Sequence, residues 1–408
     1  MKFDKKQYLE ENYGRNVLPL SVFDNSTRPG GVPMEDLLFY KKGTSITKLQ
    51  ESLVKTIDHY NLFSSRLIMI DNNKFALQYC TDGAVIDVLP PLPVCSDHVK
   101  VEDIKKLMMH VKTLPGEPLF AVTGIPIEDG VIGAISCSHA VADGISLMLF
   151  LYAWGCIIEG KSFLPPSPQR LFKGEPVVFE TMDKQFTPPL SALSAEIQNR
   201  VQRNMNMKTF SKKEYFSDEF LEDMKDKALL ENGQYALSNN QMINAYLLKK
   251  YHHQILPDAG TIRVRVPIDL RDVHPDIDAT YIGNAFFMSF TEYTKEDINN
   301  MSIYEIAYRL KKSIQKMRRK DYIKNIAYLS AYGVELKEDV FKDYPPYNPE
   351  TDILSTNMAH FADLDSLGLG SKVGSLLNID TVVQTCFTMI KEESNRMFAQ
   401  VTGMYPLT

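Results

Sequence analysis

The amino-acid sequence predicts an α/β fold made of two domains. The chain has 408 residues, more than one ordinary hydrophobic core holds, so two domains are expected. Segments with the period of a strand and segments with the period of a helix mix through both halves of the chain, as in layered α/β proteins. A stretch near residues 170–210, which combines prolines with mixed polar side chains, marks the expected seam.

The first half is expected to contain several short strands and three helices. Apolar residues at helical spacing predict a helix over residues 49–60 and another over 104–111. The run from Ile145 to Ile158 predicts a buried helix, because it is too short to span a bilayer. Glu128-Asp129-Gly130 is a good turn sequence for a hairpin. The predicted strands are 67–70, 75–79, 84–89, 119–127 and 131–136.

The second half repeats this mixture of strands and helices. Arg263 and Arg265 alternate with apolar residues, which is typical of a strand. The other elements follow from the same spacing rules: helices over 220–230, 239–251 and 301–320, a helical portion near 190–205, and strands over 261–268, 285–291, 353–355, 382–390 and 398–402. The expected domains are therefore 1–175 and 213–408, joined by a crossover connection over 176–212.

Composition and charge exclude several classes of protein. The chain is 44% hydrophobic and 24% charged, as soluble globular proteins are, and its net charge of −6 argues against a nucleic-acid partner. Residues 1–14 are charged and lack the apolar segment of a signal peptide, so a cytoplasmic protein with no membrane span is expected. The five cysteines show no metal-ligand spacing, so neither a disulfide framework nor a metal site is expected.

One short motif carries chemistry, His139-Ala140-Val141-Ala142-Asp143-Gly144. It lies between a predicted strand and the predicted buried helix, so His139 would lie at a strand–loop–helix junction. An imidazole changes charge near neutral pH and can take and return a proton. The alternative is a structural histidine with satisfied hydrogen bonds. A thiol nucleophile at Cys137 is a weaker alternative, because no basic neighbour is evident to lower its pKa.

Several motifs in a fixed order resemble the BAHD acyltransferases, a family within the superfamily of chloramphenicol acetyltransferase and peptide-synthetase condensation domains. Ser138 stands where relatives with a double histidine have the first one, which favours the BAHD branch. The C-terminal element Asp365–Gly370 keeps only Gly-x-Gly and lacks the family's aromatic residues. The motifs that carry the resemblance are Leu18–Asp24, Leu37–Tyr40, Leu49–Leu67, the His139 motif with Trp154 at the end of its helix, Pro165–Arg170, Val266–Arg271 and Tyr281–Asn284.

The resemblance implies a fold and an activity. The fold would consist of two chloramphenicol acetyltransferase-like domains, each a mixed β-sheet flanked by helices, with the active-site tunnel at their interface. The activity would be acyl transfer in secondary metabolism, from a CoA thioester to a small-molecule alcohol or amine. His139 would be the general base, and no acyl-enzyme would form. The resemblance implies a monomer with acyl-CoA as co-substrate, no permanently bound cofactor and no metal.

The resemblance also implies roles for residues around the base. Asp143 would pair with Arg271 rather than orient the imidazole as a triad carboxylate does, and Gly144 would give the loop room. Asp269 and Asn284 belong to the same supporting motif.

Two further groups of residues are candidates for binding the substrate. Ser355, Thr356 and Asn357 could donate to the oxyanion, although a polar turn after a strand is the alternative. The CoA phosphates would be bound by Lys311, Lys312, Lys316 and Arg318, although these lie where any solvated helix end carries cations.

Two alternative functions remain open at this point. One is a condensation-type enzyme whose acyl donor is held on a carrier protein, which would show a docking surface in place of a phosphate pocket. The other is a non-catalytic binding relative of the family, for which the altered C-terminal element leaves room.

Overall fold

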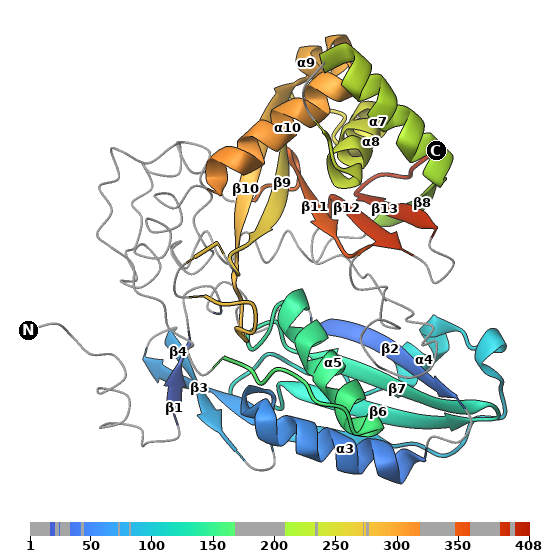
Figure 1. Ribbon diagram of the computed structural model, residues 1–408, viewed down its shortest axis with the longest axis vertical. Coiled ribbons are helices and arrows are strands. Elements are labelled where there is room, and N and C mark those ends of the chain that lie inside the picture. The colour runs from blue at the N-terminus through green and yellow to red at the C-terminus, as the bar shows by residue number, and fades with distance from the viewer. Residues whose placement is uncertain are drawn as a thin grey trace, which may run out of the picture. The chain divides into compact units, whose positions relative to one another are not determined.

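The computed structural model divides into two compact units, each described by itself below (Figure 1). The first unit contains the described residues up to 167 together with 277–285, and the second contains the rest. This division differs in one respect from the expected domains 1–175 and 213–408. Residues 277–285 belong to the first unit, although they lie within the range expected for the second domain. The structure describes residues 17–20, 24, 33–41, 45–71, 74–80, 83–167, 209–232, 236–271, 273–274, 277–318, 347–359, 384–391 and 396–408.

The first unit contains a mixed sheet of four strands in the order β2-β7-β6-β5. β2 and β6 run antiparallel to β7, and β5 runs parallel to β6. A second sheet, in the order β1-β4-β3, is antiparallel throughout. The bounds are β1 Val17–Pro19, β2 Met34–Lys41, β3 Ser65–Asp71, β4 Lys74–Tyr79, β5 Ala84–Val88, β6 Phe120–Ile127 and β7 Gly130–Cys137.

Helices cover both faces of the four-stranded sheet. α3 (Ile46–His59) and α5 (Gly144–Glu159) lie side by side on one face, as Figure 1 shows. Their apolar side chains share one core with alternate residues of β2 and β7. α4 (Val101–Leu107) packs on the opposite face, where Ile104 meets Leu37 and Ile132. Two short 3₁₀ helices complete the unit, η1 Asn61–Ser64 and η2 Ser96–His98.

Aromatic side chains hold the motif-bearing helix α5 in place. The ring centroid of Phe150 lies 4.4 Å from that of Phe63, in a tilted arrangement, and 5.0 Å from that of Phe120, in an edge-to-face arrangement. The indole N–H of Trp154 donates to the hydroxyl of Ser52 on α3 at 2.9 Å, so its one polar group is satisfied in the core. These contacts give the first residues of α5 a rigid support.

One carboxylate, Asp36 on β2, lies inside this apolar core. It is 4% exposed, and burial raises its pKa from 3.8 to about 7, although its oxygen accepts a hydrogen bond from the Leu37 backbone N–H at 2.8 Å. On the same strand, the buried hydroxyl of Tyr40 has no hydrogen-bond partner among the residues that the structure describes. The folded state therefore favours the protonated form of Asp36.

We expect Asp36 to make the first unit less stable as the pH rises. The folded protein keeps this proton up to about pH 7, whereas the unfolded chain releases it near 3.8, so the native state binds more protons between these values. Relative to Asp36→Asn, the wild-type free energy of unfolding should fall by about 2–4 kcal/mol between pH 4 and pH 8. Urea unfolding at both pH values measures this; parallel pH dependence of the two proteins would contradict it.

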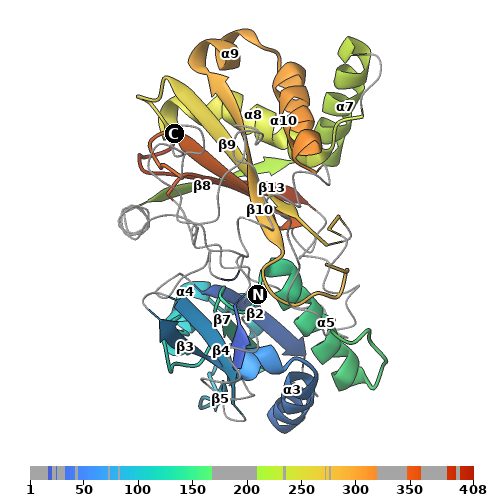
Figure 2. The same cartoon turned by 90° about the vertical axis from the view of Figure 1, so that its left-hand side faces the viewer.

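The second unit is built on one six-stranded sheet in the order β10-β9-β11-β12-β13-β8. β11 is parallel to both β9 and β12, and the other pairs are antiparallel. Figure 2 shows β9 and β10 as a long pair with α10 beside them. The strand bounds are β8 Phe210–Phe216, β9 Thr261–Asp269, β10 Phe286–Thr294, β11 Asp352–Asn357, β12 Cys386–Lys391 and β13 Met397–Gly403.

Helices supply the rest of the second core. α8 contacts both α7 and α10 and packs on β12 and β13. Three of these helices begin with a capping box. The hydroxyl of the N-cap residue accepts from the backbone N–H three residues later, and the side chain of that later residue accepts from the backbone N–H of the N-cap residue. The helices are α7 Asp218–Asn232, α8 Asn239–Ile255, α9 Lys295–Asn300 and α10 Ile303–Met317. Within the described ranges, no helix is long and apolar enough to cross a membrane.

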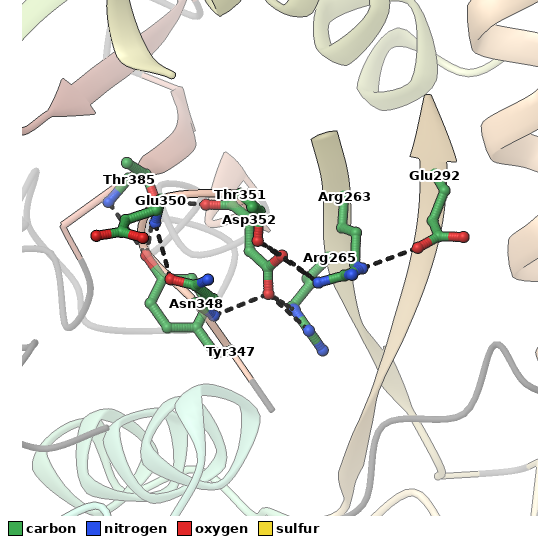
Figure 3. A network of polar contacts seen from close by, with 9 residues as sticks. All are labelled: Arg263, Arg265, Glu292, Tyr347, Asn348, Glu350, Thr351, Asp352 and Thr385. Carbon is green, nitrogen blue, oxygen red and sulfur yellow. Dashed lines mark hydrogen bonds and ion pairs between the residues drawn. The ribbon is translucent and has the colours of Figure 1, made fainter. Parts of the chain in front are cut away.

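A buried ion-pair network attaches the start of β11 to β9 (Figure 3). Asp352 is fully buried, and its Oδ2 accepts from the guanidinium of Arg265 at 2.6 Å. Its Oδ1 lies 3.2 Å from Nη1 of Arg263 and accepts from the Thr351 hydroxyl at 2.9 Å. The backbone N–H of Asn348 donates to Oδ2 at 2.9 Å. The carboxylate thus has several donors, which a buried charge requires.

Most predicted elements are confirmed, with differences at helix ends and at one edge. The helix predicted over 104–111 ends at Leu107, because Met108 is extended and the N–H of Met109 donates to the Thr123 hydroxyl. The helix predicted over 301–320 begins at Ile303, after its cap at Ser302. The prediction missed β8, an edge strand whose charged residues hide its alternation, and also the short elements β1 and α9. The predicted helical portion at 190–205 lies outside the described residues.

Candidate active site

His139 lies in the loop between the end of β7 and the start of α5, as predicted. Its side chain is half-buried. The loop is tied to the sheet by Ser138, whose backbone N–H donates to Leu119 O at 2.8 Å and whose hydroxyl contacts that of Thr113 at 2.9 Å. The imidazole therefore projects from a loop that is fixed at both ends, as a general base requires.

Asp143 caps α5 and also reaches the segment 277–285. Its Oδ1 accepts from the backbone N–H of Ser146 at 2.8 Å, which is the N-cap interaction expected of Asp before a helix. Its Oδ2 accepts from the backbone N–H of Ala285 at 3.0 Å. Asp143 therefore holds two backbone segments of the first unit together.

Gly283 makes this arrangement possible. The Ser146 hydroxyl donates to Gly283 O at 2.8 Å and accepts from Gly283 N at 3.0 Å, so the segment is bonded to the first turn of α5. Gly283 has φ +136°, and a β carbon there would lie 3.3 Å from Oδ1 of Asp24. A side chain at this position would strain the backbone and crowd the carboxylate.

Asn284 is the polar neighbour of the imidazole. Its Oδ1 lies 2.8 Å from Nδ1 of His139, and its Nδ2 donates to the backbone carbonyl of His139 at 2.7 Å. Asp24, from the N-terminal motif, accepts from both the backbone N–H and the side-chain Nδ2 of Asn284. The sequence placed Asn284 in a supporting motif, and the structure brings it into contact with the predicted base.

The remaining residues of the predicted support lie in the second unit. Nη1 of Arg271 lies 2.9 Å from Oδ1 of Asp269, and the guanidinium of Arg271 is almost fully buried. The pairing of Asp143 with Arg271 that the family resemblance implies remains a prediction.

Cys137 is fully buried, and burial raises the pKa of its thiol well above the usual range. That environment is unsuited to a thiolate nucleophile. It agrees with the sequence analysis, in which a nucleophile at Cys137 is a weaker alternative than a base at His139.

The three oxyanion candidates differ in their surroundings. Side chains alternate along β11, and Ser355 is in register with Phe387, so it points into the core beneath the helices. Its buried hydroxyl has no partner within the described part of the chain. Thr356 points to the opposite face and is partly exposed, and Oδ1 of Asn357 accepts from the Ala359 backbone N–H.

Two of the four predicted CoA-phosphate residues line one cavity on the second unit. Lys312 and Lys316 lie one turn apart on α10 and border a cavity of about 280 Å³ beside β10. Arg309 adds a third cation, which the sequence analysis missed although its spacing places it on the same helix face. Lys311 donates instead to Ala236 O at 2.5 Å, and Arg318 is the C-cap of α10. Thr291, Glu292 and Ser313 complete the lining.

Comparison with known proteins identifies the class. A sequence model of the Transferase family matches residues 10–395, nearly the whole chain. The protein is therefore an acyltransferase. It belongs to the Transferase family, the BAHD acyltransferases, which confirms the resemblance seen in its motifs. The comparison with curated protein sequences found no match.

Solved structures confirm the fold of two chloramphenicol acetyltransferase-like domains. F. sporotrichioides TRI101, complexed with coenzyme A and T-2, has a TM-score of 0.69 and 15% identity, covering 95% of this chain and 94% of that one. For vinorine synthase the TM-score is 0.63, with 16% identity and coverage of 95% and 92%. The first condensation domain of the calcium-dependent antibiotic synthetase has a TM-score of 0.62, 12% identity, and coverage of 95% and 91%.

Proposed function

We propose that this acyltransferase moves an acyl group from acyl-CoA to the hydroxyl or amine of a small molecule, with His139 as general base. The observation that carries the proposal is the half-buried imidazole at the strand–loop–helix junction, with Nδ1 bonded to Asn284. The contact engages Nδ1, and Nε2 is the ring nitrogen proposed to take the proton of the acceptor. Structural neighbours complexed with coenzyme A support the choice of donor.

The proposed reaction is a direct transfer. His139 removes the proton of the acceptor as its oxygen or nitrogen forms a bond to the thioester carbonyl carbon. The tetrahedral intermediate then collapses, the carbon–sulfur bond breaks, and His139 returns the proton to the departing thiolate. Thr356 is the proposed donor to the oxyanion, because its hydroxyl lies on the partly exposed face of β11, whereas Ser355 lies in the core.

A screen for thiol release tests the donor and the acceptor together. Acyl-CoA thioesters of several chain lengths are incubated with candidate alcohols and amines, and free thiol is followed with a colour reagent. Acceptor-dependent thiol release supports the proposal. Transfer from an acyl group on a phosphopantetheine carrier protein, without transfer from acyl-CoA, would favour the condensation alternative. No reaction with either donor would favour a binding protein.

We also propose that this enzyme is cytoplasmic, is a monomer and acts in secondary metabolism.

The cavity beside α10 is proposed to bind the CoA phosphates. Phosphates bind where several cations converge, and Arg309, Lys312 and Lys316 line one cavity. Lys312→Glu with Lys316→Glu should raise the KM for acyl-CoA by about tenfold, and added salt should reduce the difference between the variant and the wild type. Steady-state kinetics at low and high ionic strength measures this effect.

The matched control for this prediction is Lys311→Glu. It makes the same charge change on the same helix, but Lys311 does not line the cavity and donates to Ala236 O. If Lys311→Glu raises KM as much as the double variant does, the phosphates bind elsewhere and the effect is one of overall charge.

A further inference from the structure

We infer that Asp24 is a positioning residue, which fixes the tautomer of His139 by orienting the side-chain amide of Asn284. The inference deepens the proposed function, because it assigns the ring nitrogen that acts as the base. It concerns three side chains of the first unit that lie far apart in the sequence.

Asp24, Asn284 and His139 are linked by a chain of hydrogen bonds, which we call the relay. Asp24 and Asn284 are both fully buried. Oδ1 of Asp24 accepts from the backbone N–H of Asn284 at 2.8 Å and from its Nδ2 at 3.0 Å. The same Nδ2 donates to the His139 carbonyl at 2.7 Å, and Oδ1 of Asn284 lies 2.8 Å from the imidazole Nδ1.

These partners allow only one orientation of the amide. A carboxylate and a backbone carbonyl accept hydrogen bonds and cannot donate them. Both face one end of the Asn284 amide, so that end must be the NH₂ group. Turning the amide over would place its oxygen against two other oxygens and remove the hydrogen bond that Nδ2 gives to each of them, which is costly away from water. The amide oxygen therefore faces His139.

The orientation of the amide determines the tautomer. An oxygen at 2.8 Å from Nδ1 requires that Nδ1 carry the hydrogen and donate it. In the neutral imidazole the other nitrogen, Nε2, then has a lone pair and can take the proton of the acceptor. In the opposite tautomer two lone pairs would face each other, and Nε2 would already carry a proton. Asp24 thus supports the form of His139 that can act as a base.

The test reads the tautomer directly by ¹⁵N NMR of protein labelled at histidine. The nitrogen shifts distinguish protonated from unprotonated ring nitrogens, and the His139→Gln variant assigns the signal. In the wild type, we expect a protonated Nδ1 and an unprotonated Nε2 in the neutral form. Asp24→Ala removes the acceptor and should give a mixture of tautomers, with kcat about tenfold lower and KM nearly unchanged.

Further variants separate positioning from a general loss of structure. In Asp24→Asn the new carbonyl oxygen can still accept from both N–H groups of Asn284, so the tautomer and most of the kcat should be retained. Asp24→Ser is the second variant in case Asp24→Ala does not fold, since its side chain is one atom too short to make the contact. Asp36→Asn removes another buried carboxylate of the same unit and should leave the His139 signals unchanged.

The possible results separate the inference from the proposed function. A wild-type signal with hydrogen on Nε2 overturns the inference, whatever the enzyme does. Unchanged tautomer and kcat in a folded Asp24→Ala or Asp24→Ser overturns it as well. If neither of these variants folds, the tautomer of the wild type decides. If the tautomer behaves as expected but His139 proves unnecessary for thiol release, the relay stands and the proposed mechanism is wrong.

Discussion

His139→Ala should lower kcat by about 10²- to 10⁴-fold, the usual contribution of a general base. KM for acyl-CoA should change little, because the imidazole acts on the acceptor's proton in the transition state. The free energy of unfolding should fall by about 1–3 kcal/mol, because Oδ1 of Asn284 loses its donor inside the protein. Thiol release under saturating substrates, together with urea unfolding, measures both effects.

The control for this prediction is His98→Ala, which removes an exposed histidine from the short helix η2. It should leave turnover and stability close to those of the wild type. Full turnover by His139→Ala on the true substrates would exclude the mechanism.

Asp352→Ala should destabilise the second unit by about 3–5 kcal/mol, the usual effect of leaving one partner of a buried ion pair alone. The guanidinium of Arg265 is 1% exposed and contacts Asp352 at 2.6 Å, so its charge would stay buried without this partner. The hydroxyl of Thr351 and the backbone N–H of Asn348 would lose their acceptor too. Urea unfolding followed by circular dichroism measures the change.

Two comparisons sharpen this prediction. Asp223→Ala breaks a pair with Lys227 of 2.6 Å in which both side chains are more than half exposed, and it should cost less than about 0.5 kcal/mol. The double variant Asp352→Leu with Arg265→Met replaces both charges by apolar groups and should be more stable than Asp352→Ala. Similar small effects for Asp352→Ala and Asp223→Ala would show that the network in Figure 3 contributes little.

Local spacing in the sequence was sufficient for much of the fold. The continuous apolar run before Glu159 specifies a buried helix because every face of it is apolar, and Asp143 begins that helix because its carboxylate satisfies a free backbone N–H. The position of His139 between β7 and α5 follows from the same two elements. Each of these features depends on residues a few positions apart, whose interactions are determined by helix or strand geometry.

The residues that surround His139 could not be predicted from the local spacing of residues in the sequence. Asn284 lies 145 residues from His139 in the chain and 260 residues from Asp24, yet it contacts both. The edge strand β8 was missed for a related reason, since its charged side chains become informative only when their neighbours in space are known. Contacts between distant segments arise from how strands pair and helices pack, which local periodicity does not specify. The sequence could therefore point to His139 as the proposed base, whereas the contacts of Asn284 with His139 and with Asp24 emerged only from the folded chain.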